Sequence, residues 1–276
     1  MSLHYRQSPY TTFIDQIKLY YSTQKRDFSW REHITPYRIV VSEIMLQQTQ
    51  VNRVAQKFDE FIEAFPSFQA LAQAPFYDVL RVWKGLGYNR RALALHKIAM
   101  IVVDQYDGQL SAEPEILEIF PGIGKATARS IVTFAFNKPT VFIETNIRTV
   151  FIYHFFKNQK NVHDNDIEPL VSATVDYANP REWYYALMDY GTMLKKTVGN
   201  VSVLSRHHHQ QSKFEGSERQ LRGMILQHLL DNKQLSVQQL VQLTGQCETR
   251  VTKLIKDLYG EGLIECQGNV VTIGNV

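Results

Sequence analysis

The chain has 276 residues, 44% of them hydrophobic, which is enough to form the core of one large domain and a smaller one. A formal net charge of +3 and an isoelectric point near 8.7 permit a nucleic-acid partner without requiring one. The two cysteines, Cys247 and Cys266, are too few for a disulfide framework or a four-cysteine metal site, so we expect no metal. Because the sequence shows no signal-peptide pattern and no long apolar run, it predicts a cytoplasmic protein without a membrane partner.

Hydrophobic residues recur at helical spacing through about residue 191, so this part is predicted to be mainly α-helical. The pattern is clear in residues 13–21 and 54–62, and again in a helix that begins near Pro180. A further helix is expected over residues 115–120, after a break at Glu113-Pro114. The β-branched run at 141–143 is too short to found a sheet.

The C-terminal part follows a different pattern. We expect a domain over residues 1–194, a basic linker over 195–217 and a second, smaller domain over 218–276. The elements predicted for the small domain are a helix at 218–230, a short helix capped by Ser236, a helix at 248–259, and strands at 262–264 and 270–273. This order is typical of a winged-helix-like α+β module.

A glycine-containing turn, FPGIGKATA at residues 120–128, stands between two predicted helices. Gly122 and Gly124 allow a sharp turn with accessible backbone N–H groups, and Lys125 and Thr127 open the next helix at its positive dipole end. Such a hairpin suits a DNA phosphate, with or without a bridging monovalent cation. The alternative is an ordinary turn between two helices.

Two further segments carry candidate functional residues. Glu43 interrupts an otherwise apolar stretch, IVVSEIML at residues 39–46, where burial would raise the pKa of the carboxyl toward that of a general acid. The alternative is an exposed helix position. In the loop GLGYNRR at 85–91, Tyr88, Arg90 and Arg91 are suited to entering a base stack and binding phosphates. The alternative is a tight loop with Tyr88 packed in the core.

These motifs, in this order, resemble the adenine glycosylase branch of the helix–hairpin–helix DNA glycosylase superfamily. The resemblance covers about residues 8–194 and includes FSWR at 28–31, SEIMLQQT at 42–49, IETN at 143–146 and ALMDYG at 186–191. It implies a mainly α, two-lobed catalytic domain that binds DNA between its lobes. The winged-helix-like module follows that domain.

The resemblance also implies a role for each matching position. Glu43 would protonate adenine N7, and Glu144 would stabilise the positive charge that develops on the sugar. Gln48 and Tyr88 would fill the gap left by the flipped base, and the hairpin would hold a phosphate. The residues expected to line the base pocket are Trp30, Arg31, Leu46 and Ala126.

Several positions depart from the family pattern. Glu144 stands where relatives have Asp, which lengthens the side chain by one methylene. Lys195 stands where the first of four cluster-binding cysteines is expected, so we predict that there is no iron–sulfur cluster and no other cofactor. Ala126 occupies the slot of the lysine that strand-cleaving relatives use as a Schiff-base nucleophile, so we predict no lyase activity. The usual C-terminal module for 8-oxoguanine is replaced.

The sequence therefore predicts a nucleoid-associated, monomeric, monofunctional DNA glycosylase of base excision repair. Its expected substrate is double-stranded DNA in which adenine is mispaired with guanine or 8-oxoguanine. Two alternatives stay open: a glycosylase for another mismatched or modified base, such as thymine or uracil opposite guanine, and a DNA-binding protein without catalysis.

Overall fold

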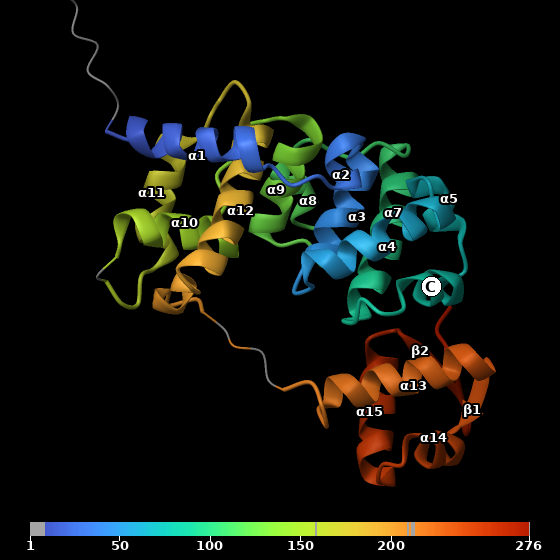
Figure 1. Cartoon of the computed structure of the whole chain (residues 1–276). Coiled ribbons are helices and arrows are strands. Elements are labelled where there is room, and N and C mark those ends of the chain that lie inside the picture. Colours follow the sequence, from blue (N-terminus) through green and yellow to red (C-terminus); the bar gives the residue numbers. More distant parts are fainter. Residues whose placement is uncertain (1–8, 158, 209, 211–212, 276) are drawn as a thin grey trace, which may run out of the picture. The chain divides into compact units, whose positions relative to one another are not determined.

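The computed structural model describes residues 9–157, 159–208, 210 and 213–275, which form two compact units (Figure 1). The first unit comprises Met1–Ile34, Ala112–Glu118 and Gly124–Gln210, and the second comprises Thr35–Ser111, Ile119–Ile123 and Gln211–Val276. Residues 1–8 of the predicted first domain, and residues 209, 211 and 212 of the predicted linker, lie outside the described part. Within that part, no helix is both long and apolar enough to span a membrane.

The first unit is helical. Its elements are α1 (Thr11–Gln24), α2 (Ser29–Glu32), α8 (Pro114–Leu117), α9 (Lys125–Phe136), α10 (Thr145–Phe155), α11 (Asp164–Thr174), α12 (Pro180–Thr197) and the 3₁₀ helix η1 (Val201–Leu204). In the core, the ring of Phe13 packs against Phe151 at 5.3 Å and Trp183 at 6.2 Å between ring centroids. These aromatic contacts join α1 to α10 and α12.

Helices α10 and α12 approach each other closely at Gly191. A Cβ atom added to Gly191 would lie 2.5 Å from the carbonyl oxygen of Asn146, so this contact requires glycine. The close approach brings the C-terminal half of α12, including Lys195, next to the first turn of α10.

The second unit combines two long stretches of chain that are far apart in sequence with the short segment Ile119–Ile123. The first stretch folds into α3 (Pro36–Leu46), α4 (Val51–Ala64), α5 (Phe68–Gln73), α6 (Phe76–Trp83) and α7 (Arg90–Tyr106). The spacing of apolar residues in α4 buries Val54, Phe58 and Phe61, as the sequence predicts. Phe61 meets Trp83 of α6 edge to face, with 6.0 Å between ring centroids.

The remainder of the second unit is the C-terminal module. It contains α13 (Glu218–Asn232), β1 (Gln234–Ser236), α14 (Val237–Thr244), α15 (Glu248–Gly260), β2 (Ile264–Gln267) and β3 (Val270–Ile273). The three strands form an antiparallel sheet in the order β1-β3-β2. Ser236 and Gln239 form a capping box at the start of α14, and Gly245 ends this helix in the left-handed conformation. The mainly α fold class with a small α+β module is confirmed.

Some predicted boundaries are wrong. The helix expected over residues 115–120 is only Pro114–Leu117, because the chain then enters the glycine hairpin. The strand expected at 262–264 is Ile264–Gln267, since Gly262 adopts a left-handed turn conformation with φ of 78°. β1 was not predicted, because three residues carry too little alternation. Residues 195–197 and 201–204 of the expected linker are helical.

Candidate active site

Glu43 lies in the middle of α3. Thr35 caps this helix by accepting a hydrogen bond from the backbone N–H of Arg38 at 3.2 Å, and Pro36 occupies the first turn. The flanking apolar residues are all fully buried: Ile39, Val40, Val41, Ile44 and Met45. Glu43 itself is half-buried, on a helix whose apolar residues are packed in the core. The expected rise in its pKa stays a prediction.

Arg91, at the start of α7, organises the chain around the end of α3. Its Nη1 donates to the carbonyl oxygens of Ile44 at 2.9 Å, Met45 at 2.7 Å and Gln47 at 2.6 Å. Its Nη2 donates to Thr49 Oγ1 at 2.8 Å and to the carbonyls of Leu86 at 3.2 Å and Gly87 at 3.1 Å. One guanidinium therefore joins α3, the loop after it and the loop at 85–88.

The predicted contact between Arg91 and DNA phosphate is wrong. The side chain is turned into the protein and Arg91 is only 8% exposed. Burial lowers the pKa of Arg91 to about 10, which still leaves the guanidinium charged at neutral pH. We assign Arg91 a positioning role. Its neighbour Arg90 is exposed, and its Nη1 lies 3.9 Å from Glu261.

Gln48 and Tyr88, the two residues expected to fill the gap in the duplex, share an unusual backbone conformation. Their φ angles are 54° and 47°, in the left-handed region that residues other than glycine seldom adopt. Gln48 is exposed and Tyr88 is half-buried. Both loop tips are attached to Arg91, which explains how the strained conformations persist.

The glycine hairpin adopts the predicted geometry. Gly122 has a φ of 76°, and a Cβ atom there would lie 3.0 Å from the Ala94 side chain. Gln47 Nε2 donates to the Gly122 carbonyl at 3.1 Å, which joins the hairpin to the end of α3. Gly124 is the N-cap of α9, and no described side chain caps this helix. The backbone N–H groups in the first turn of α9 therefore have no capping side chain among the described residues. Such groups at the positive end of a helix dipole favour the binding of an anion.

The hairpin continues into residues that are open to solvent. Lys125 and Ala126 are exposed in the first turn of α9, and Thr127 is half-buried. Leu46 is likewise half-buried at the end of α3, in the other unit. These side chains therefore have accessible surface where the resemblance expects contact with DNA or a base.

Glu144 is the N-cap of α10. Its Oε1 accepts hydrogen bonds from the backbone N–H groups of Asn146 at 2.7 Å and Ile147 at 2.8 Å. Asn146 Nδ2 lies 3.3 Å from the other carboxylate oxygen, and Lys195 Nζ donates to Asn146 Oδ1 at 2.8 Å. Burial lowers the pKa of Lys195, while the nearby Glu144 carboxylate opposes that shift. Lys195 thus supports Glu144 through Asn146.

Trp30 and Arg31 are in the interior of the first unit. The Trp30 ring stacks on Phe28 with 4.6 Å between centroids and is 4% exposed. Arg31 binds the fully buried carboxylate of Asp189 through two hydrogen bonds, of 2.9 and 3.0 Å, and covers the Tyr185 ring at 4.2 Å. Asp189 was not predicted as its partner. Contact of Trp30 or Arg31 with a base stays a prediction.

The predicted site residues are divided between the two units. Glu43, Leu46, Gln48, Tyr88 and Gly122 belong to the second unit. Trp30, Arg31, Glu144 and residues 124–127 belong to the first. Each unit therefore carries one of the two candidate catalytic carboxylates. Among the described residues, no group of three or more His, Cys, Asp or Glu side chains could hold a metal ion.

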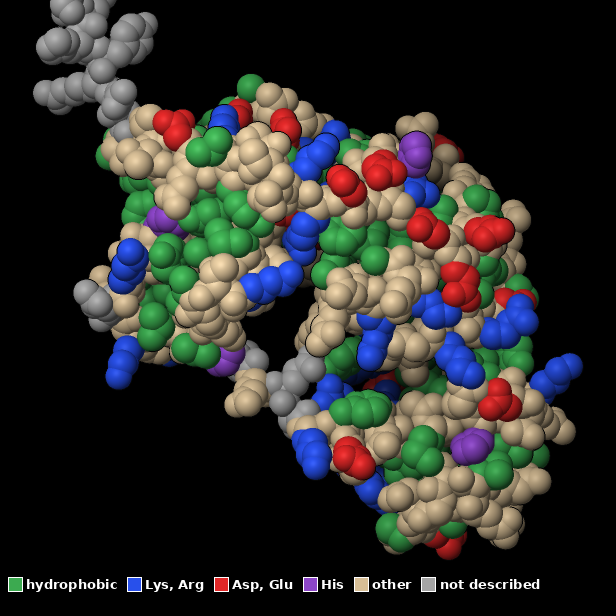
Figure 2. All heavy atoms as spheres, in the orientation of Figure 1, with side chains coloured by type: hydrophobic (Ala, Val, Ile, Leu, Met, Phe, Trp, Pro, Cys, Tyr) green, Lys and Arg blue, Asp and Glu red, His purple; other side chains and the backbone are tan. Residues whose placement is uncertain are grey.

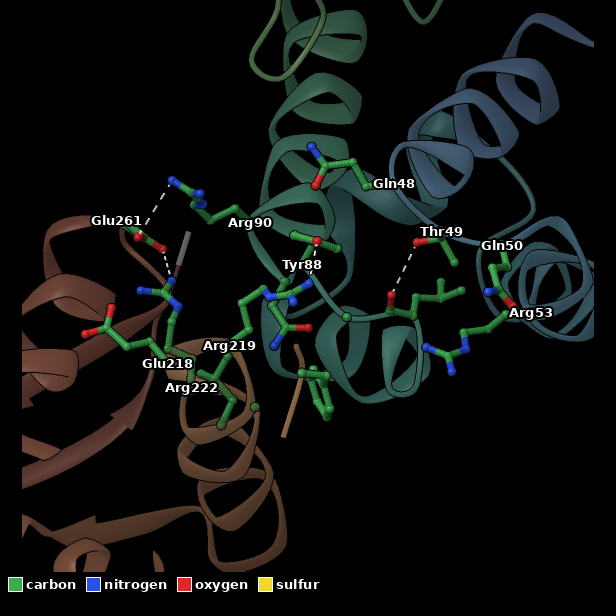
Figure 3. A pocket seen from close by; sticks show the side chains of 16 residues that line it. Gln48, Thr49, Gln50, Arg53, Tyr88, Arg90, Glu218, Arg219, Arg222 and Glu261 are labelled. Atoms are coloured by element: carbon green, nitrogen blue, oxygen red, sulfur yellow. Dashed lines mark hydrogen bonds and ion pairs between the residues drawn. The ribbon is translucent and has the colours of Figure 1, made fainter. Parts of the chain in front are cut away.

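A pocket of about 750 Å³ in the second unit was missed by the sequence analysis (Figure 3). It is lined by the loops that carry Gln48 and Tyr88, by α13 of the C-terminal module and by Glu261. Figure 2 shows Lys and Arg side chains gathered where this module meets the rest of its unit. One signal in the sequence points to this basic surface: Arg219 and Arg222 are three residues apart, which places them on the same face of a helix.

Comparison with known proteins shows similarity to DNA repair proteins over part of the chain. Residues 41–169 match the family described as HhH-GPD superfamily base excision DNA repair protein. An adenine DNA glycosylase of Buchnera aphidicola is 33% identical over 180 residues, which cover 63% of this chain and 50% of that protein. One from Mycolicibacterium smegmatis is 39% identical over 132 residues, covering 48% and 45%. The chain thus spans about half the length of these relatives.

Other relatives carry different names. A thymine/uracil-DNA glycosylase of Methanothermobacter thermautotrophicus is 26% identical over 185 residues, covering 66% of this chain and 84% of that protein. A solved thermostable thymine-DNA glycosylase has a TM-score of 0.60 at 26% identity, covering 66% of this chain and 85% of the other. Endonuclease III in a trapped complex with DNA has a TM-score of 0.51 at 16% identity, covering 73% and 87%, which shows a shared fold alone.

Residues 41–169 are therefore similar to the HhH-GPD superfamily of base excision DNA repair proteins, and the chain is similar to adenine DNA glycosylases.

Proposed function

We propose that this chain is a monofunctional DNA glycosylase that hydrolyses the N-glycosidic bond of adenine mispaired with guanine or 8-oxoguanine. The observation that carries the proposal is the rigid attachment of α3, the Gln48 loop and the Tyr88 loop to the Arg91 guanidinium. This attachment fixes the position of Glu43 relative to the two side chains that would fill the gap in the duplex. Similarity to the adenine DNA glycosylases supports the choice of base.

In this proposal Glu43 is the general acid. A proton given to adenine N7 makes the base a neutral leaving group, and a half-buried carboxyl on a rigid helix is suited to hold that proton. The bond then breaks with positive charge on the sugar. Glu144 supplies the negative charge that stabilises this cation, and water adds at C1′.

Named residues of this chain also account for the binding of DNA and for the product of the proposed reaction. Gln48 and Tyr88 fill the space of the extruded base. The open N-terminus of α9, with Lys125 and Thr127, binds a phosphate of the same strand. Because Ala126 has no amine, no Schiff base with the sugar forms at that position, and the strand stays intact at an abasic site.

We further propose that the chain works without an iron–sulfur cluster. The sequence has only two cysteines, and both lie in the C-terminal module. The bond from Lys195 to Asn146 holds together the end of α12 and the start of α10. Duplex DNA is the proposed partner, and the protein would act where chromosomal DNA is accessible.

A second candidate is the excision of thymine or uracil opposite guanine. The thymine/uracil-DNA glycosylase matches over 84% of its own length, whereas the adenine enzymes match over about half of theirs. The exposed side chain of Ala126 and the longer side chain of Glu144 are the positions at which a different base would be accommodated.

Release of the free base from four duplexes separates the candidates. The duplexes carry A:8-oxoG, A:G, T:G and U:G pairs, and each reaction is divided into samples with and without hot alkali. We expect adenine from the first two duplexes and strand breaks only after alkali. Thymine or uracil release without adenine release would favour the second candidate. No base from any duplex would contradict both, and breaks without alkali would contradict the monofunctional assignment.

A further inference from the structure

The pocket beside Tyr88 contains the chemical groups that bind a nucleotide. Its lining includes four arginines, Arg53, Arg90, Arg219 and Arg222, and only two carboxylates, those of Glu218 and Glu261 (Figure 3). It also presents the aromatic rings of Tyr88 and Phe214, of which Phe214 is 59% exposed. Guanidinium groups bind phosphates, and aromatic faces stack on bases. Neither Glu43 nor the hairpin lines this pocket, so it is separate from the proposed acid and phosphate site.

Arg219 connects the C-terminal module directly to the loop of Tyr88. Its Nη1 donates to the Tyr88 hydroxyl at 2.8 Å, and its guanidinium lies 5.7 Å from the Tyr88 ring centroid. The same guanidinium lies 5.9 Å from the ring of Phe214. Arg219 is therefore held at the edge of the pocket by groups that DNA would also contact.

Arg222 lies one turn further along α13 and is held by an acid. It forms an ion pair with Glu261, and Arg90 lies 3.9 Å from the same carboxylate. Both side chains of the Arg222–Glu261 pair are about one quarter exposed, at 22% and 23%. A phosphate entering the pocket can exchange with Glu261 as the partner of these arginines, since the pair is accessible to solvent.

The position of α13 is fixed at its other end as well. The Tyr77 hydroxyl of α6 donates to the Leu230 carbonyl at 2.5 Å, near the end of α13. The helix is thus attached to the Tyr88 loop at one end and to α6 at the other. Arginines on such a helix are pre-organised for binding, which reduces the entropy lost on association.

We propose that the pocket binds one nucleotide of the duplex beside the gap that Tyr88 fills, and that α13 is the part of the C-terminal module that contacts DNA. Arg219 and Arg222 bind its phosphate, and its base stacks on Phe214. The proposal rests on DNA as the partner in the proposed function. It assigns binding to the first turns of α13, whereas a winged-helix module ordinarily uses the helix that corresponds to α15.

Fluorescence anisotropy on the full-length protein tests this assignment. The probe is a labelled duplex with a tetrahydrofuran abasic analogue, which cannot be turned over. The double variant Arg219→Gln/Arg222→Gln should bind at least tenfold more weakly near 0.1 M salt. The slope of log K against log salt should decrease by about 1, because the two arginines bind one phosphate and each lost phosphate contact contributes about 0.9. The comparison variant Lys256→Gln, on α15, removes an exposed positive charge outside the pocket and should bind as the wild type does.

Two further variants separate binding from structural effects. Phe214→Ala should weaken binding about fivefold without changing the salt slope, because stacking involves no charge. Glu261→Gln removes an anion and releases two arginines, so it should bind about threefold more tightly. A purely structural role for the Arg222–Glu261 pair predicts weaker binding instead.

The proposal is overturned if the α13 double variant keeps wild-type affinity and salt slope, if the α15 variant is the one that loses affinity, or if Phe214→Ala binds like the wild type. Thermal melting of every variant shows whether it is folded. Base release by the wild type is measured separately. A wild type that releases no base while α13 still governs binding would contradict the proposed function and not this inference.

Discussion

At the scale of single residues, Arg91 has the most partners in the proposed site. Its guanidinium donates to six oxygens from three segments of chain, and a lysine ammonium can satisfy at most three of them. We predict that Arg91→Lys lowers the free energy of unfolding by about 2–3 kcal/mol, because buried carbonyls lose a charged donor. Urea unfolding measures the change. Arg90→Lys, at an exposed position, is the control and should be near neutral; equal effects would contradict the assignment.

Glu144 has both a structural and a proposed chemical role, and these can be separated. Its carboxylate caps α10 through two backbone N–H groups. In Glu144→Gln the amide oxygen can still accept these bonds, but the negative charge near the sugar is lost. We predict a decrease in the single-turnover rate of about 10²-fold with little change in melting temperature. Glu144→Ala should lose about 1 kcal/mol of stability as well, because the cap is removed. A Gln variant with full activity would show that the charge is not used.

Among the secondary-structure elements, the contact between α10 and α12 depends on one glycine. Gly191→Ala places a methyl group against the Asn146 carbonyl, so the helices must separate and displace the start of α10. We predict a loss of about 1–3 kcal/mol in unfolding free energy. The control is Gly223→Ala in α13, where nothing lies within 4 Å of the new Cβ. That variant should gain about 0.5–1 kcal/mol from helix propensity. Destabilisation by both variants, or by neither, would contradict this account of the helix contact.

Most helices could be predicted from the sequence because their signals are local. The spacing of Val54, Phe58 and Phe61 predicts the buried face of α4, and Ser236 with Gln239 predicts the start of α14. β1 could not be predicted, because a three-residue strand forms only through pairing with β3, which lies far along the chain. Its existence depends on tertiary contacts rather than on local pattern.

The candidate site was predictable where one motif carries the geometry, as at Gly122 and Gly124. It was not predictable where side chains from distant segments meet. From the sequence, Arg91 is predicted to be a surface cation like its neighbour Arg90. It is buried because its guanidinium binds the carbonyl groups at the end of α3, a contact that only the structure shows. Asp189, the partner of Arg31, is likewise 158 positions away. Long-range partners of this kind leave no local pattern.

At the scale of the whole molecule, each of the two compact units is built from stretches that are not consecutive in the sequence. The second unit joins Thr35–Ser111 to Gln211–Val276, whereas the change in composition along the chain predicts a boundary near residue 194. Composition indicates where the chain changes character, but it does not indicate which surfaces pack together. The hydrogen bonds from Tyr77 to Leu230 and from Arg219 to Tyr88 carry that information.

The central claim is that Glu43 protonates and releases a flipped adenine. Single-turnover release of adenine from an A:8-oxoG duplex, by the wild type and by Glu43→Gln, tests it most directly. We predict one adenine per duplex from the wild type, a rate lower by about 10²–10⁴-fold in the variant, and binding of the duplex by both. Equal rates for the two proteins, or no adenine from the wild type although it binds the duplex, would contradict the account.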